Sequence, residues 1–421
     1  MKQKIYVTTI MTLLICSFSS SVLSASPFER RRDQFQDTPG SLLLPFPYSI
    51  PGIGEGTILV GYAGNVLGTY TDVIGFGFTG DAAGYALLVD EFFVIPKYLY
   101  LAVDQGFAAK YGQNVYSSRG MESKKEDFNI FVGENSRFKS YDVVLTLFDR
   151  RLELTYGSSA FEGKFVDILD FEGEQIQELD EPVEFKSSQS HIQMLLDITD
   201  DYNDPRSGLK IRLVKDSFPA QNGEEPEYDT ITSAVTYFVP LLKESTWAFH
   251  YFRSEAIVKQ KGNIDLESLK QKNGFSYCNG NTACQQAVIA KAQNQLNANK
   301  NGTAKALGGS EQLRSYPLNR YQAAVAELYG TEFRWNFSTG GELNWFFFND
   351  VIDSLQAAVF LEQGSVAEEV RDLGNIVRSS YGAGLRFVGR SGSVYRLDYA
   401  TGDEGSEVTA FFEFPWSGFL E

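Results

Sequence analysis

Two cysteines are the side chains in this sequence best suited to covalent chemistry. Cys278 and Cys284 are separated by five residues, whereas the third cysteine, Cys16, lies in an apolar N-terminal run that we expect to be removed. In an oxidising compartment such a pair commonly forms a disulfide. A metal site is the alternative, but the two histidines, His191 and His250, are distant in sequence from the pair. We therefore predict a disulfide between Cys278 and Cys284.

Patterns that would indicate an enzyme are missing. The sequence contains no nucleophile elbow, no phosphate-binding glycine loop and no His, Cys, Asp or Glu cluster with metal-ligand spacing. Glu362, Asp398 and Glu413 could act as an acid and a base, but they are better explained as the polar lining of a pore. We predict no enzymatic activity, no cofactor and no metal.

The N-terminus explains why an oxidising compartment is expected. A basic start, residues 1–4, precedes an apolar run over residues 5–16 that is too short to span a bilayer. Small residues follow and allow cleavage after Ser24 or Ala25. We therefore predict that residues 1–25 form a signal peptide and that the mature chain is exported.

The composition excludes one class of partner. The chain carries 37 Lys and Arg against 54 Asp and Glu, a formal net charge of −17. Removal of Lys2 and Lys4 with the signal peptide leaves 35 basic against 54 acidic residues, or −19. A basic surface for nucleic acid is excluded. The acidity is typical of solvated loops, and loop carboxylates that hold divalent cations are the alternative.

Segments with alternating apolar and polar residues recur along the chain and predict β-strands. Outside the signal peptide, no stretch approaches the ~18–20 uninterrupted apolar residues of a membrane helix. Strands that cross a membrane must close into a barrel, because every backbone NH and CO group needs a partner. A soluble β-sandwich or β-helix could share the alternation, but the export signal favours the barrel. The clearest segments are residues 209–213, 230–239, 332–338, 342–347, 395–399 and 408–414, with a hairpin turn at 339–341.

The strand content defines one domain. The fold class is all-β, a transmembrane β-barrel over residues 51–421 with roughly 14 to 18 strands of ~10 residues each. Residues 26–50, which contain Arg30-Arg31-Arg32 and several prolines, are predicted as a short periplasmic tail or plug segment. A long extracellular loop covers about 259–321, and Thr282 can cap a helix within it. Pro415 should end the last strand, since proline cannot donate to a ladder.

The end of the long loop carries a recognisable motif. Gly308 and Gly309 lead into Leu313-Arg314-Ser315-Tyr316. This stretch resembles the BamA/TamA superfamily of outer-membrane assembly and translocation barrels, also called the bacterial surface antigen family. There a Gly-Gly precedes an apolar-Arg-Gly-aromatic tetrad at the tip of the sixth extracellular loop, which folds back into the barrel. Ser315 replaces the glycine, so the turn should differ if that position needs a positive φ.

The resemblance also implies a partner for Arg314. The family pairs the loop arginine with an acidic residue on an inward-facing strand, in an aromatic-x-acidic-x-Gly setting that Phe360-Leu361-Glu362-Gln363-Gly364 fits. We therefore expect Arg314 to contact Glu362 in the lumen. A guanidinium on a carboxylate gives two charge-assisted hydrogen bonds, a strong tether for an inserted loop. A solvated loop charge is the alternative for Arg314.

Weaker similarity extends over about residues 200–421, including the turn 201–208 and the strands at 381–387 and 395–398. The resemblance favours 16 antiparallel strands with a long loop folding into the lumen. Assembly members carry periplasmic POTRA domains ahead of the barrel, and we expect this chain to be a barrel-only member that lacks them.

The expected function is therefore stated as two alternatives. The first is assembly or translocation of proteins at the outer membrane of a Gram-negative bacterium. The second is a passive channel or structural outer-membrane protein without assembly activity. Expected partners are outer-membrane lipids and lipopolysaccharide, and client outer-membrane proteins or a periplasmic partner, with no nucleic acid. A homo-oligomer is left open.

Overall fold

The computed structural model describes most of the chain after the predicted signal peptide. The signal peptide and its cleavage site lie outside the described residues, as do the predicted turn and strand at 340–347 and Glu413. The described residues are 29–35, 39–116, 118–220, 224–242, 244–279, 281–339, 348–349, 352–389, 394–412 and 414–416.

The described elements are almost all strands. The strands are β1 Gly40–Ile50, β2 Gly54–Gly64, β3 Asp72–Gly80, β4 Ala83–Ile95, β5 Leu99–Tyr116, β6 Phe128–Leu147, β7 Leu152–Leu169, β8 Gln175–Thr199, β9 Gly208–Phe218, β10 Glu227–Pro240, β11 Ser245–Gln260, β12 Val325–Thr339, β13 Phe348–Asn349, β14 Ile352–Ala367, β15 Arg378–Gly389, β16 Val394–Gly402 and β17 Gly405–Phe412. The helical segments are η1 Val66–Gly68, α2 Leu266–Lys272, η2 Phe275–Cys278, α3 Thr282–Asn301 and η3 Val370–Asp372.

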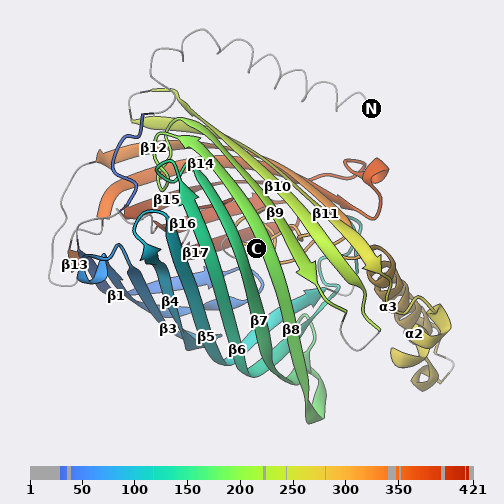
Figure 1. Cartoon of the computed structure of the whole chain (residues 1–421). Helices are drawn as coiled ribbons and strands as arrows, with labels where there is room; N and C mark the ends of the chain where they lie inside the picture. Colours follow the sequence, from blue (N-terminus) through green and yellow to red (C-terminus); the bar gives the residue numbers. More distant parts are fainter. Residues whose placement is uncertain are drawn as a thin grey trace.

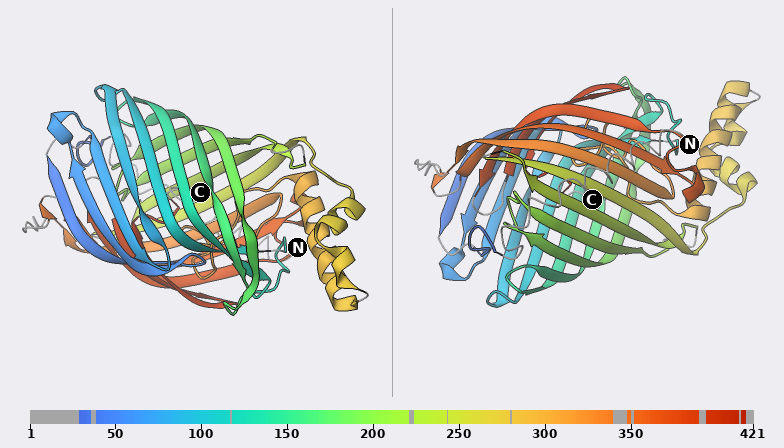
Figure 2. Two further views of the ribbon diagram at one scale, coloured as in Figure 1. Left: turned by 90° about the horizontal axis from the view of Figure 1, so that it is seen from below. Right: turned by 90° about the horizontal axis from the view of Figure 1, so that it is seen from above.

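These strands form one closed antiparallel barrel (Figures 1 and 2). Each long strand pairs with its neighbours in the chain, and β1 closes the circle by pairing with both β2 and β17. Among the described residues, 16 strands have eight residues or more, and the two-residue β13 pairs with the start of β1. The predicted 16-stranded antiparallel barrel is confirmed.

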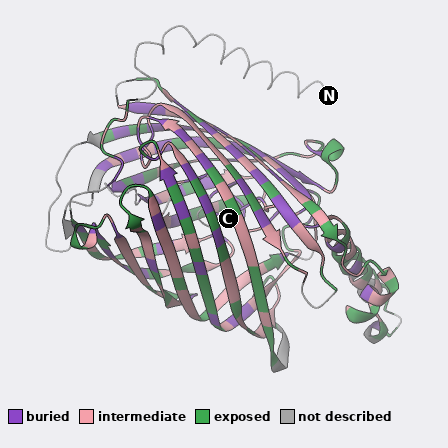
Figure 3. Ribbon diagram, in the orientation of Figure 1, coloured by how far each residue is buried: buried purple, intermediate pink, exposed green. Residues whose placement is uncertain are grey.

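Apolar side chains face outward and polar side chains face the lumen. On β7, Leu154 and Tyr156 are exposed, whereas Glu153 and Thr155, which alternate with them, are buried. Buried and exposed positions alternate in this way along most strands (Figure 3). A soluble barrel would bury its apolar face, so this arrangement is that of a barrel surrounded by lipid. Among the described residues, no helix has the length and apolar character needed to cross a membrane.

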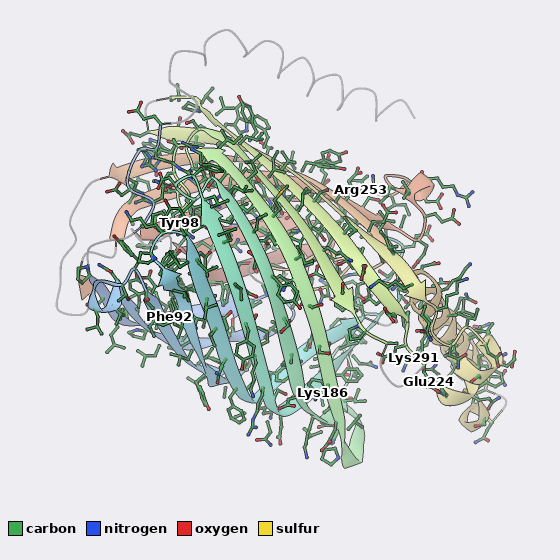
Figure 4. All side chains as sticks on the ribbon, in the orientation of Figure 1. Phe92, Tyr98, Lys186, Glu224, Arg253 and Lys291 are labelled. Atoms are coloured by element: carbon green, nitrogen blue, oxygen red, sulfur yellow. The ribbon has the colours of Figure 1, made fainter. Side chains whose placement is uncertain are left out.

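The two ends of the barrel differ. Residues 96–98, between β4 and β5, form a short turn at one end, and the longest connection, 261–324, lies at the other end, which also has two-residue turns at 81–82 and 403–404. Outer-membrane barrels have short periplasmic turns and longer extracellular loops, which assigns the α2–α3 end to the outside. In Figure 4, Phe92 and Tyr98 lie toward the short-turn end, and Lys186 and Lys291 lie toward the long-loop end.

β1 and β17 meet along a short seam. All eleven residues of β1 pair with β2, but among the described residues β1 pairs with β17 only at Ser49 and Ala410. Continuing this antiparallel register would place Pro47 opposite Phe412. Proline has no amide hydrogen for the ladder, and Pro45 repeats the defect two residues earlier on the same edge of the strand. The two prolines of β1 therefore limit how many residues of β1 can pair with β17.

The first strand begins earlier than the sequence predicted. We placed residues 26–50 in a tail and began the barrel at residue 51, whereas β1 starts at Gly40. Pro45 and Pro47 argued against a strand, but β1 lies at the seam, where a strand edge tolerates missing donors. The last strand also differs from the prediction of residues 408–414, because β17 begins at Gly405 and ends at Phe412.

The long loop contains more helix than predicted. The predicted helix is present as α3, with Thr282 as its first residue, and it extends to Asn301. A second helix, α2, precedes it and begins after Asp265, whose side chain accepts a hydrogen bond from the Glu267 backbone NH at 3.1 Å. Both helices stand at the outer end of the barrel (Figure 1).

Candidate functional site

The segment after α3 turns into the lumen. Gly308 and Gly309 have φ angles of 109° and 121°, which only glycine adopts without strain. A Cβ on Gly308 would lie 2.3 Å from the Pro317 carbonyl oxygen, so the chain could not double back there with a larger residue. Leu313 has a φ of 48°, whereas Ser315 is not among the residues with positive φ. Serine therefore fits in place of the family's glycine, because the left-handed residue here is Leu313.

Arg314 is buried at the tip of this segment. Its Nε donates to Glu362 Oε1 at 3.1 Å, and its backbone NH donates to Glu362 Oε2 at 3.0 Å. One terminal nitrogen, Nη1, also donates to Asp398 at 2.8 Å and to Glu332 at 3.2 Å. The guanidinium carbon lies 3.3 Å from the centre of the Phe360 ring. The structure thus brings the expected pair together, but adds two more carboxylates to it.

These carboxylates belong to a larger set of charges, here called the lumen charge network. Glu332 accepts two hydrogen bonds of 2.6 Å from Arg386 and one of 2.7 Å from Arg334. Asp398 accepts one of 2.8 Å from Arg396. All members are nearly inaccessible to solvent, and they join the loop to four consecutive long strands. The network consists of Arg314, Arg334, Arg386, Arg396, Glu332, Glu362 and Asp398.

A tryptophan from beyond the last strand completes this site. Trp416 Nε1 donates to Glu362 Oε1 at 2.9 Å, and its indole stacks on His250 with ring centres 4.7 Å apart and planes 3° apart. A Cβ on Gly330 would lie 2.6 Å from the Trp416 ring, so a glycine on β12 makes room for it. The chain after β17 therefore bends into the lumen, which links the seam strand to the partner of Arg314.

Apolar contacts hold the loop tip beside the charges. Leu313 and Tyr316 are fully buried, and Leu307 packs with them. A Cβ on Gly364 would lie 2.7 Å from Leu307 and 3.1 Å from Leu313, which gives a steric reason for the glycine after Glu362. The Ser315 backbone NH donates to the Ser380 hydroxyl at 2.9 Å.

A second buried arginine anchors the returning part of the loop. Arg320 donates to both carboxylate oxygens of Glu404, at 2.8 and 2.6 Å, and to the Ser123 hydroxyl at 2.7 Å. Its side chain is fully buried. The sequence analysis missed this pair, because Glu404 lies in a short turn without a strand pattern. The loop is thus held at two charged points along its length.

The described part of the tail, residues 29–35, binds the short-turn end of the barrel and is here called the N-terminal arm. Arg31 and Arg32 both contact the buried Asp201, which precedes β9. Arg30 donates to the Thr199 carbonyl oxygen at 3.1 Å. Phe35 is buried, and its ring lies 5.7 Å from that of Phe93. The arginine run is therefore a docking segment, and the acidic turn 200–207 is its receptor.

Substitution of Asp201 by asparagine should release the N-terminal arm. Asp201 accepts hydrogen bonds of 3.2 Å from both Arg31 and Arg32, and such charged bonds contribute roughly 1.5–3 kcal/mol each. We expect trypsin to cleave after the arm arginines about tenfold faster in Asp201→Asn than in the unmodified protein. Asp149→Asn is the control, because the Asp149 side chain is 51% exposed and 3.9 Å from Arg30. Equal rates for the two variants would contradict the docking role of Asp201.

The arm should also respond to acid. Burial would raise the pKa of Asp204, but the guanidinium groups of Arg31 and Arg206 hold this pKa below its usual value. A depressed pKa gives stability that is present above the usual aspartate value and is lost as the pH falls through the folded-state pKa. The arm should therefore loosen below about pH 4. Spin labels at Asp33 and Tyr98 should move apart between pH 7 and that range, and an unchanged distance would argue against this.

The cysteine pair remains a prediction. Cys278 is buried at the end of η2, while the side chain of Cys284 lies outside the described residues. We expect alkylation of the unfolded mature protein to add two labels after reduction and none before it, read as a mass shift. Labelling of both cysteines without reductant would show that the disulfide is absent.

A cavity of about 1130 Å³ remains in the lumen beside the loop. Asp90, Asp104 and Asp142 line one wall of it, from β4, β5 and β6. Asp142 has a partner in His191, whose Nε2 lies 3.2 Å from its Oδ1. In the part of the chain that the structure describes, no group of three or more His, Cys, Asp or Glu is arranged to hold a metal ion.

Comparison with known proteins gives matches of fold only. No family model and no curated protein matches this chain. The chain is similar to the solved structure of BamA from Haemophilus ducreyi lacking POTRA domains 1-3, with 10% identity, 91% of this chain and 75% of that chain covered, and a TM-score of 0.46. CdiB from Escherichia coli matches with 11% identity, 90% and 62% coverage and a TM-score of 0.48. Wzi from Escherichia coli, an outer membrane protein, matches with 7% identity, 91% and 86% coverage and a TM-score of 0.33.

Proposed function

We propose that this chain aids the insertion or translocation of proteins at the outer membrane, with the seam between β1 and β17 as the working edge. The observation that carries this proposal is the seam itself: among the described residues, β1 forms one residue pair with β17 but eleven with β2. The edge of β17 that β1 leaves largely unpaired offers backbone amide and carbonyl groups to an incoming strand, whereas Pro45 and Pro47 deprive β1 of donors. The proposal includes membership of the BamA/TamA superfamily, supported by the loop motif and the contact of Arg314 with Glu362.

The buried loop gives the seam a fixed support. The lumen charge network ties the loop to β12, β14, β15 and β16, so the wall next to β17 is held from inside. Trp416 then connects the segment after β17 to Glu362. Separation of β17 from β1 would therefore occur beside a rigid wall, which favours opening at this one place.

The test is reconstitution of the purified barrel in liposomes with an unfolded client barrel. We expect the client to fold faster than in empty liposomes, and we expect a disulfide between cysteines placed at Ser49 and Ala410 to abolish this gain. Their Cα positions are paired in the seam, and a matched pair at Tyr399 and Val408 crosses the continuous β16–β17 ladder instead. Acceleration should survive the control disulfide and return on reduction of the seam disulfide.

A passive channel is the second candidate, and the lumen cavity favours it. The carboxylates of Asp90, Asp104 and Asp142 on one wall would attract cations. Conductance across a planar bilayer separates the two candidates. Steady cation-selective conductance without any acceleration of client folding would remove the assembly proposal and support the channel.

A further inference from the structure

A small hollow lies on the outer face of the barrel, toward the long-loop end of β6 to β11. It has a volume of about 430 Å³ and is lined by hydroxyl groups and two lysines, here called the serine hollow. Its defining residues are Ser158, Ser188, Ser190, Ser217, Lys139 and Lys259. Lys186, on the same strand as Ser188 and Ser190, marks this end of β8 in Figure 4.

Strand register explains why the surface is hollow there. Ser158, Ser190 and Ser217 are direct partners across three neighbouring strands, β7, β8 and β9. One step toward the membrane on the same face, Tyr156 and Ile192 are paired and are 62% and 58% exposed. Ser158 and Ser190 thus stand directly above large apolar side chains that face lipid, while Lys215 takes the corresponding place below Ser217. The hollow therefore lies at the boundary between the apolar band and the polar outer rim.

The charges around the hollow are suited to an anion. Lys139 makes no ion pair with any described residue, and its ammonium group is exposed at the rim. On the opposite rim, Lys259 and Lys215 approach the carboxylate of Asp229 at 2.6 and 3.0 Å. Asp229 and Glu227, which lies 3.7 Å from Lys259, balance these two ammonium groups, so the uncompensated positive charge at the hollow is that of Lys139.

The hydroxyl groups add hydrogen-bond donors. Within the described residues, the side chains of Ser158, Ser188 and Ser190 make no hydrogen bond to other protein groups. A hydroxyl can turn its hydrogen toward a phosphate oxygen, and a lysine donates a charge-assisted bond to the same group. The small serine side chains thus leave room for a phosphate group in the hollow, and their hydroxyl groups can donate hydrogen bonds to it.

We propose that the serine hollow binds the phosphorylated headgroup of an outer-leaflet lipid, whose acyl chains lie on the apolar residues below it. The position selects a lipid over a soluble anion, because Tyr156 and Ile192 of the lipid-facing band lie directly below Ser158 and Ser190. The phosphate would then contact the serine row of β7 and β8, and the acyl chains would contact the apolar residues two positions along the same strands. This site is independent of the proposed assembly role, since it lies on β6 to β11, away from the seam.

The experiment uses the purified full barrel in detergent, mixed with bis-phosphorylated lipid A and examined by native mass spectrometry. We expect the unmodified protein to retain this lipid and the Lys139→Glu, Lys259→Glu double variant to retain at least tenfold less. Ser190→Trp fills the hollow without changing charge and should give the same loss. A second arm uses lipid A without phosphate, which the unmodified protein should retain at least tenfold less.

The matched control is Lys164→Glu with Lys186→Glu, which changes the same charge on β7 and β8 outside the hollow. We expect this control to retain lipid A as the unmodified protein does. Heat-dependent gel migration reports folding of each variant, and Ser190→Trp carries the test if the charge variant fails to fold. Equal retention by unmodified and hollow variants, or equal retention of the two lipids, would overturn the proposal.

Discussion

Replacement of Arg314 by alanine is expected to prevent the barrel from reaching a stable folded state. Arg314 is fully buried and contacts Glu362, Asp398 and Glu332. Its removal leaves these carboxylates in the lumen with less positive charge, and breaking a buried ion pair typically costs about 3–5 kcal/mol. We expect loss of the heat-resistant folded band on gels and a lower unfolding midpoint in denaturant. Arg371→Ala is the control, because the Arg371 side chain is 77% exposed.

The structure also predicts how a charge exchange behaves. If Arg314 had Glu362 as its sole partner, Arg314→Glu combined with Glu362→Arg would restore stability. A carboxylate at position 314 would still face Asp398 and Glu332, which lie 2.8 and 3.2 Å from the present arginine. We therefore expect the double variant to be no more stable than the Arg314→Glu single variant. Full recovery would show that the pair is independent of the wider network.

Glu332→Gln is expected to have the second largest effect. Glu332 accepts hydrogen bonds from Arg386, Arg334 and Arg314, so a neutral amide leaves three buried guanidinium groups short of one negative charge. The side-chain shape is kept, which separates the loss of charge from a loss of packing. We expect destabilisation by about 3 kcal/mol, measured from unfolding in denaturant.

The matched control is Glu327→Gln on the same strand. The Glu327 side chain points outward and is 23% exposed, so its change should shift stability by less than about 0.5 kcal/mol. A similar effect at both positions would mean that β12 tolerates or needs carboxylates regardless of the face. That outcome would contradict the special role of the lumen side.

Much of the architecture could be predicted because it depends on local patterns. Alternation predicted the strands, and the loop motif with Phe360-Leu361-Glu362 predicted the meeting of Arg314 and Glu362. The other network members also showed a signal. Glu332 and Arg334 alternate with the outward aromatics of β12, which already placed them on the lumen face. Which of these residues meet Arg314 depends on the register between neighbouring strands, and the sequence of one strand does not determine that register.

Other features had no local signal. Trp416 follows a proline after the last strand, where the alternation has ended, so its position under Glu362 depends on the closed barrel. The start of β1 was misplaced for the opposite reason. Pro45 and Pro47 are a real local signal against pairing, but it applies to one edge of the strand while the other edge pairs completely. The prediction did not distinguish the edge of β1 that pairs with β2 from the edge that faces β17.

The edge of β1 that lacks amide hydrogens also affects how neighbouring copies of the barrel can associate in a membrane. In a membrane packed with barrels, two incompletely paired strands could join the sheets of neighbouring copies, as exposed edges do in aggregation. At Pro45 and Pro47 the edge of β1 presents carbonyl groups but no amide hydrogens. A second copy could not continue a regular ladder through this stretch. The prolines thus keep this edge of β1 from serving as the template on which a second copy polymerises.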